Sequence, residues 1–123
     1  MGAAAALACI NETKRLNVTE NAAARGMHMF KGLKKLATKH EMIGDVRGGC
    51  GLMSALELTS DRKTKAKPVK AFVDAIYQKA YENGVIIRIS GPNVILSPPL
   101  VISETEVNSI ITALDTAFTA VCE

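Results

Sequence analysis

Two short apolar runs joined by a turn constrain the fold of this chain more than any other feature. The first run is Val85-Ile86-Ile87-Arg88-Ile89, and the second extends from Val94 to Leu100. Burying a guanidinium among isoleucines costs free energy unless an anion meets it. Arg88 is therefore either lifted to solvent at the edge of a sheet or reserved for an acidic partner.

Strand alternation separates Arg88 from its apolar neighbours. Ile87 and Ile89 fall on one side of the strand and Arg88 falls on the other, so the arginine can project toward a cleft while the isoleucines build a core. A planar guanidinium binds a carboxylate through two parallel hydrogen bonds, which lysine cannot do. The residues alone leave two interpretations open: a ligand-binding arginine, or a surface or structurally paired one.

Helical periodicity and end signals predict four helices. The first lies in the alanine-rich stretch 3–8, the second runs from Asn17 to Lys39 or His40, the third from Pro68 to Asn83-Gly84, and the fourth follows Ser103. Asn17 is expected to cap its helix while Glu20 reaches back, and Ser103 and Glu106 form a second capping box. The stripe expected to be buried on the third helix contains Val69, Phe72, Val73, Ile76 and Ala80.

Two further strands are expected at 42–47 and 52–58, on either side of Gly48-Gly49-Cys50-Gly51. Leu52, Leu56 and Leu58 share one face of the second strand, as a sheet with one covered side requires. The order is helix, helix, strand, strand, helix, strand, strand, helix. It predicts one α+β domain over residues 1–123, a small, mostly antiparallel sheet covered by helices.

Several classes of site are not expected. The glycine cluster leads into a strand and not a helix, so it favours a tight turn or bulge over a phosphate cradle. His28 and His40 lack carboxylates or cysteines at ligand spacing, which indicates structural or surface roles. Cys9, Cys50 and Cys122 are odd in number and far apart, so we expect reduced thiols, no metal site and a cytoplasmic protein.

Charge and hydropathy limit the partners. The formal net charge is only +3, and the basic residues gather only in the stretch 62–70, which is most simply a solvated loop. No reading motif accompanies that stretch, and no apolar run is long enough to span a bilayer. We expect neither a nucleic-acid nor a membrane partner.

Three ordered motifs carry a family resemblance. They are Val46-Arg47-Gly48 with Gly51-Leu52-Met53, then Gly84-Val85-Ile86-Ile87-Arg88, then Leu96-Ser97-Pro98-Pro99-Leu100. Together they resemble the carboxy-terminal small domain of class III pyridoxal-phosphate aminotransferases, most closely the omega-amino acid or amine–pyruvate transaminase branch. One departure is a glycine turn one residue longer than the family pattern Val-Arg-Gly-x-Gly-Leu-Met.

The resemblance implies a fold like the carboxy-terminal domain of fold-type I enzymes that use pyridoxal phosphate. It implies a parent enzyme, usually a homodimer, that passes an amino group from an amine or omega-amino acid to pyruvate or a similar oxo acid. Residues 1–16 resemble the helix that leaves the large domain, so 1–123 is expected to be a truncated small domain.

The same resemblance places the cofactor lysine, the pyridine-binding aspartate and the phosphate-binding segments in the large domain. No catalytic, cofactor-binding or metal-binding residue is therefore assigned to this chain, which is expected to be inactive alone and to bind no cofactor. Substrates would reach it through the large domain. Arg88 is the one residue carried over, as the group that pairs with the substrate carboxylate and swings aside when the substrate has none.

Two alternatives remain from other functional classes. The chain could be a stand-alone α+β module for ligand sensing or assembly, without chemistry of its own. It could also be a basic RNA-binding domain, which would bind polyanions in a salt-sensitive way.

Overall fold

A computed structural model describes residues 2–122, and its elements follow the predicted order. They are α1 (Gly2–Arg15), α2 (Val18–Lys39), β1 (Ile43–Arg47), β2 (Ser54–Leu58), α3 (Lys70–Glu82), β3 (Arg88–Ser90), β4 (Asn93–Leu96) and α4 (Glu104–Cys122). The α+β class and the element order are confirmed.

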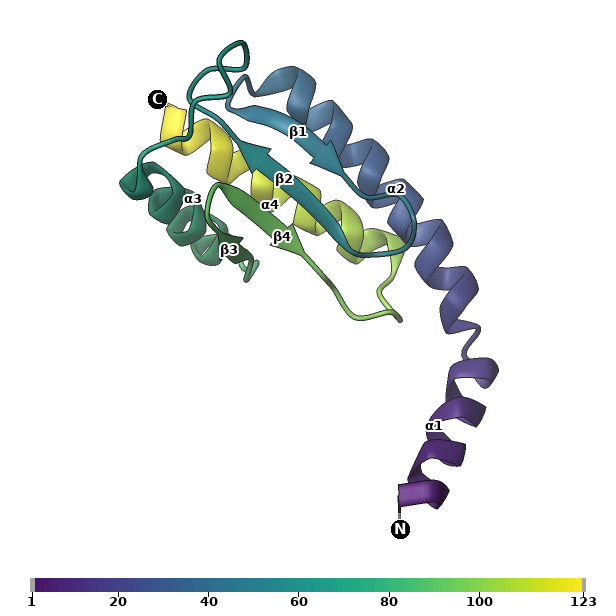
Figure 1. Ribbon diagram of the computed structural model, residues 1–123. Helices are drawn as coiled ribbons and strands as arrows, with labels where there is room; N and C mark the ends of the chain where they lie inside the picture. The colour runs from purple at the N-terminus through teal and green to yellow at the C-terminus, as the bar shows by residue number, and fades with distance from the viewer. Residues whose placement is uncertain (1, 123) are drawn as a thin grey trace.

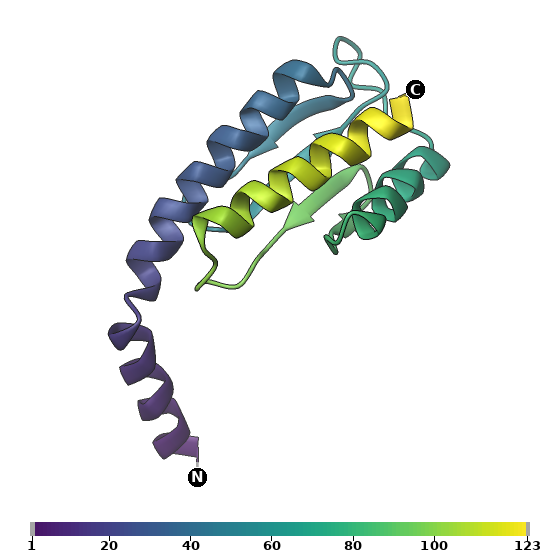
Figure 2. The same ribbon diagram turned by 180° about the vertical axis from the view of Figure 1, so that it is seen from behind.

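The four strands form one sheet in the order β1-β2-β4-β3, with every neighbouring pair antiparallel. Helices α2 and α4 lie side by side against one face, and α3 lies beside α4 (Figure 2). Among residues 2–122, no helix lies in front of the opposite face of the sheet (Figure 1). The molecule therefore has two layers, one helical and one of strands, with a bare strand face.

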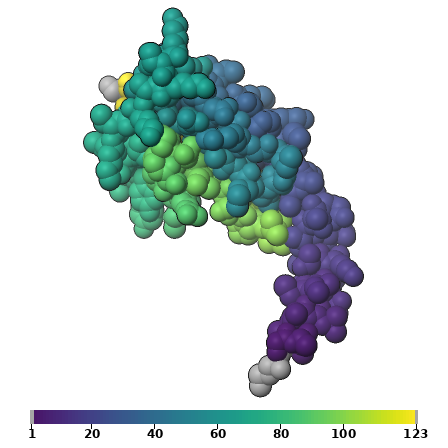
Figure 3. Space-filling view, in the orientation of Figure 1, coloured from purple at the N-terminus to yellow at the C-terminus, as the bar shows by residue number. Residues whose placement is uncertain are grey.

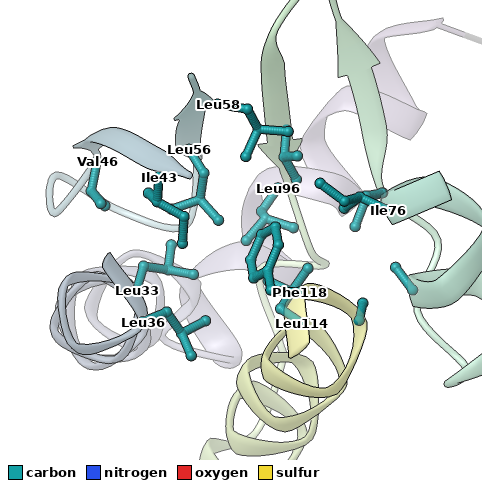
Figure 4. Close-up of a cluster of buried hydrophobic side chains, with 14 of the residues drawn as sticks. Leu33, Leu36, Ile43, Val46, Leu56, Leu58, Ile76, Leu96, Leu114 and Phe118 are labelled. Atoms are coloured by element: carbon teal, nitrogen blue, oxygen red, sulfur yellow. The ribbon is translucent and has the colours of Figure 1, made fainter. Parts of the chain in front are cut away.

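The core fills the space between the layers. Figure 4 shows side chains of α2 and α4 pointing at side chains of β1, β2 and β4. The largest fully buried side chains are Phe118, Met29, Leu33, Ile43, Leu56, Leu58, Ile76, Leu114, Val94 and Val107. On α2 and α4 they recur at helical spacing, and on β2 they alternate with half-buried residues, as predicted.

The start of α4 confirms the predicted capping box. The backbone N–H of Glu106 donates to Ser103 Oγ (3.2 Å), and the N–H of Ser103 donates to Glu106 Oε2 (2.8 Å). Two backbone donors that lack helical partners are thereby satisfied. The bonds from Ser103 also hold the pKa of the Glu106 carboxyl below its ordinary value.

The predicted side-chain cap at Asn17 is wrong. Asn17 adopts the left-handed conformation (φ 47°, ψ 45°), and its side chain makes no capping bond. Both backbone polar groups of Asn17 are hydrogen-bonded: its N–H donates to the carbonyl oxygen of Lys14 (3.2 Å), and its own carbonyl accepts from the N–H of Asn21 (3.0 Å). Asparagine tolerates this geometry better than most residues. It forms the junction from which α1 projects away from the body with no buried residue (Figures 1 and 3).

The third helix also begins later than predicted. It starts at Lys70, two positions after Pro68, and Val69 takes the preceding extended position. Val69 is therefore 72% exposed and not part of the buried stripe. The end is as predicted, with Asn83 capping the helix and Gly84 at φ 82°.

The strands are shorter than the apolar runs that predict them. β2 begins at Ser54, although Leu52 is still buried, and β3 contains only Arg88–Ser90. β4 ends at Leu96, before Pro98 and Pro99, because proline cannot donate to a strand ladder. Among residues 2–122, no helix combines the length and apolar character needed to cross a membrane.

Candidate functional site

The bare face of the sheet carries a row of side chains with an arginine at each end. Register pairs Arg47 with Ala55, Ala55 with Ile95, and Ile95 with Arg88. These four residues belong to the four strands in spatial order and alternate with residues buried under the helices. Three strand spacings separate the two arginines, or about 14 Å between their backbones.

Arg47 is held by its neighbours on the sheet. Its guanidinium donates to Glu57 Oε2 (3.1 Å) and Asn93 Oδ1 (2.7 Å), and Asp45 Oδ2 lies 3.8 Å away. Glu57 and Asn93 face each other on adjacent strands, so the arginine bridges the sheet surface. Its charge is already matched within the domain.

Arg88 is the unmatched member of the row. Its side chain is exposed at the start of the edge strand, opposite to buried Ile87, as alternation predicts. Within residues 2–122, its guanidinium has no hydrogen-bond acceptor and no carboxylate partner. It lines a cavity of about 400 Å³ whose other walls are mainly apolar and include Ile95, Pro98, Pro99, Ile102 and Ile110. One free cation beside an apolar hollow suits a small anion with an apolar body.

The wall formed by residues 97–102 is tied to α2. Asn21 Nδ2 donates to the carbonyl oxygens of Leu100 (2.8 Å) and Ile102 (3.1 Å). Arg25 pairs with Glu104 one helical turn further on. These contacts join positions about eighty apart in the chain and fix the loop that faces Arg88.

His28 continues the same face of α2. Its Nε2 lies 2.7 Å from Asn108 Oδ1 on α4. The histidine thus joins the two helices, and within residues 2–122 no acid or thiol bonds to it. This is the structural role expected for it.

The glycine cluster is an irregular loop next to this surface. Gly48, Gly49 and Gly51 have φ of 151°, 93° and 102°, values that favour glycine, and β2 begins after Leu52 and Met53, at Ser54. A Cβ on Gly26 of α2 would overlap the carbonyl of Gly51, so the loop rests directly on the helix backbone. The loop is a turn packed on α2, as expected.

A polar cluster around the buried His40 was missed by the sequence reasoning. His40 is 7% exposed, and its Nε2 lies 2.6 Å from Asp115 Oδ1. Lys39 Nζ donates to both oxygens of Asp115 (2.8 and 2.7 Å). The bonds from Lys39 and then from His40 hold the pKa of the Asp115 carboxyl below its ordinary value. No signal in the sequence points to Asp115, because it lies 75 positions from His40.

The lysines do not fit a covalently bound aldehyde cofactor. Such a lysine must lose its proton near neutral pH, which requires burial or a neighbouring cation. Among residues 2–122, nine lysines are exposed and Lys79, the tenth, is half-exposed and ion-paired with Glu82 (2.8 Å). The same residues contain no group of three or more potential metal ligands, and Cys9, Cys50 and Cys122 are exposed free thiols.

The chain is similar to known proteins over nearly all of its length. The family described as "Aminotransferase class-III" matches residues 1–118. The chain is 38% identical to taurine–pyruvate aminotransferase of Bilophila wadsworthia over 98% of its own length, and 40% identical over 90% to an Arabidopsis thaliana protein described as alanine–glyoxylate aminotransferase 2 homolog 2, mitochondrial. It spans about 28% and 24% of those relatives.

A solved structure gives the same picture. An amine transaminase from an uncultivated Pseudomonas species, described as PLP-bound, superposes with a TM-score of 0.89 at 35% identity. The superposition covers 95% of this chain and 27% of that one. The similarity therefore extends over almost all of these residues and about a quarter of a longer enzyme.

Proposed function

The chain belongs to the class-III aminotransferase family, and we propose that it is the small, substrate-closing domain of a pyridoxal-phosphate-dependent transaminase. The proposed reaction passes an amino group from an amine or omega-amino acid to pyruvate or a similar oxo acid. Two kinds of relative support it: proteins described as taurine–pyruvate aminotransferases, and a solved amine transaminase.

The role of Arg88 is to bind the substrate carboxylate. The observation that carries this proposal is an exposed guanidinium, without an acidic partner among residues 2–122, on the rim of an apolar cavity. A carboxylate can accept two hydrogen bonds from it, and the apolar walls can hold the rest of a small substrate. The guanidinium can turn to solvent when a substrate lacks the carboxylate.

The cofactor would be held by another part of the enzyme. Within residues 2–122 no lysine has the surroundings that covalent attachment requires, so residues 1–123 would form one domain that is inactive alone. Residues 1–16 would connect it to the large domain, since α1 projects from the body with no buried residue (Figure 1). The proposed enzyme is a cytoplasmic homodimer, and exposed free thiols suit a reducing compartment.

The role of Arg88 can be tested in a chimaera. This chain replaces the matched segment of the Bilophila wadsworthia enzyme, and the amino-donor half-reaction is followed with β-alanine and with a simple amine. Arg88→Ala should lower kcat/KM for β-alanine by about 10- to 100-fold, because a charge-assisted bond is lost, and should spare the amine. Arg88→Lys should lower kcat/KM for β-alanine by an intermediate factor, because lysine keeps the positive charge but cannot form two parallel hydrogen bonds with a carboxylate. Equal losses for both donors would remove the proposed role.

Inactivity of the isolated domain has its own test. Residues 1–123 are mixed with pyridoxal phosphate, reduced with borohydride and analysed by mass spectrometry. Only scattered, substoichiometric labelling of exposed lysines is expected. A stoichiometric adduct on one lysine would show that this chain holds the cofactor itself.

A further inference from the structure

The loop between β2 and α3, residues 59–69, has a defined shape. Thr59 Oγ1 lies 2.8 Å from the carbonyl oxygens of both Asp61 and Ala66, and its single hydrogen can be donated to either of them. Asp61 Oδ1 accepts the backbone N–H groups of Lys63 (2.7 Å) and Thr64 (3.4 Å). The loop projects from the body at the end opposite α1 (Figure 3). Its internal bonds mean that binding a partner would cost little ordering entropy.

Arg62 anchors this loop to the end of α2. Its guanidinium donates to the carbonyl oxygens of Ala37, His40 (2.9 Å) and Glu41 (2.9 Å). Carbonyls at a helix end lack intrahelical partners, and a cation there also suits the helix dipole. The stretch is exposed, as a solvated loop requires, and Arg62 also fixes it to the end of α2.

Three lysines of the loop remain without acidic partners. Lys63, Lys65 and Lys67 are exposed, and within residues 2–122 none of them forms an ion pair. Lys65 also adopts φ 54°, a conformation that is costly for residues other than glycine. A costly, well-bonded loop that displays three free cations indicates a binding surface more than a flexible connection.

A groove with apolar and charged walls lies beside these lysines. A hollow of about 890 Å³ between the loop, the start of α3 and the end of α4 includes Met42, Pro68, Val69, Phe72 and Cys122 among its walls. Its charged lining residues are Arg62, Lys63 and Lys67 together with the acidic Glu41 and Asp61, so its cations outnumber its carboxylates. A second hollow of about 340 Å³ shares Lys67 and Pro68 with the first. It continues the groove along Val73, Ile89 and Pro92. We call the two hollows together the basic groove.

We propose that the basic groove binds an extended acidic segment of a partner protein that inserts two apolar side chains. Each hollow can take one apolar side chain, while carboxylates between them meet Lys63 and Lys67. Nucleic acid fits less well, because bases stack on exposed aromatic rings and Phe72, the one aromatic residue that lines the two hollows, is half-buried. The groove shares no lining residue with the cavity at Arg88, so a docked segment leaves that cavity open.

The binding test uses the 123-residue chain and a fluorescent peptide in which glutamates surround a leucine and a phenylalanine. Fluorescence anisotropy should show saturable binding that weakens as salt rises, because the contacts are partly between exposed charges. A peptide with lysines in place of the glutamates, and one with serines in place of the apolar residues, should both bind at least tenfold more weakly.

The chain contains its own reporters of where the peptide binds. Cys122 lines the groove, whereas Cys9 lies on α1 and Cys50 lies in the glycine loop, and all three are exposed. Bound peptide should slow alkylation of Cys122 and leave the other two unchanged, as measured by mass spectrometry. Lys63→Glu with Lys67→Glu should weaken binding about tenfold or more, and Val69→Ser should weaken it without unfolding, because Val69 is 72% exposed.

A matched double variant guards against a general charge effect. Lys31→Glu with Lys35→Glu changes the net charge equally on exposed positions of α2 outside the groove, and should leave affinity within about twofold. Equal losses in both double variants, no binding up to about 1 mM peptide, or unprotected Cys122 would each overturn the proposal. So would tighter, competing binding of poly-uridylate RNA, or protection of Cys122 by self-association in the absence of peptide.

Discussion

The two faces of the sheet differ in what their side chains do. Toward the helices, Leu56 and Val94 are completely buried and belong to the same core cluster as residues of α2 and α4. Ala55 and Ile95 are the neighbours of Leu56 and Val94 along the strands and lie on the bare face. They are only half-buried, and they lie between Arg47 and Arg88. The comparison teaches that alternation divides one short sheet into a surface that stabilises the fold and a surface available for binding.

The largest effect is expected on the helical side of the sheet. Phe118 is completely buried and its ring lies 5.5 Å from that of His40. Phe118→Ala would leave a cavity in the core and should lower the free energy of unfolding by about 3–5 kcal/mol, measured by urea denaturation. Phe118→Leu keeps most of the volume and should cost much less. A small loss for Phe118→Ala would mean that the two layers are not packed as described.

A smaller, pH-dependent effect is expected where α2 meets α4. The pKa of Asp115 is lowered by Lys39 and then by His40, so its ionised form contributes stability above the pKa it has in the unfolded chain. That contribution should disappear as the pH falls below roughly 4 through the lower folded pKa. Asp115→Asn should therefore be less stable at neutral pH and should converge with the unmodified chain in acid. Parallel curves for the two proteins would contradict this prediction.

The smallest effect on stability is expected at Arg88. It has no partner among residues 2–122, so Arg88→Ala should change the free energy of unfolding by no more than about 0.5 kcal/mol. Arg47→Ala should cost more than Arg88→Ala, because it leaves Glu57 and Asp45 together without their cation. Urea midpoints of the two variants provide the measurement. A marked loss for Arg88→Ala would indicate a structural role on the bare face.

Local patterns predicted much of the fold. Ser103 and Glu106 lie three positions apart and form a capping box through short-range hydrogen bonds. The pair Asn83-Gly84 likewise ends its helix through short-range bonds. The alternation of Leu52, Leu56 and Leu58 fixes a face without knowledge of the rest of the chain. Asn17 failed as a cap because its role depends on α1 arriving from the other side, which its own sequence context does not reveal.

Contacts between distant residues could not be predicted. Asp115 and Arg62 have ordinary neighbours in sequence, and only folding brings them to His40 at the end of α2. The candidate site shows the same division. The exposure of Arg88 follows from alternation, whereas its cavity needs walls from residues 95–110 that a single strand cannot specify. The binding role of Arg88 stays a prediction.

The contact between Gly26 and Gly51 determines where the connection from β1 to β2 can vary. Because the helix offers a bare backbone there, the loop carbonyl lies against it with no spare space. An added residue in Gly48-Gly49-Cys50-Gly51 would therefore have to be accommodated on the outer side, where Cys50 is exposed. Extra length in this turn therefore changes the protein surface next to Arg47 and leaves the packing of the loop and its strands against α2 unchanged.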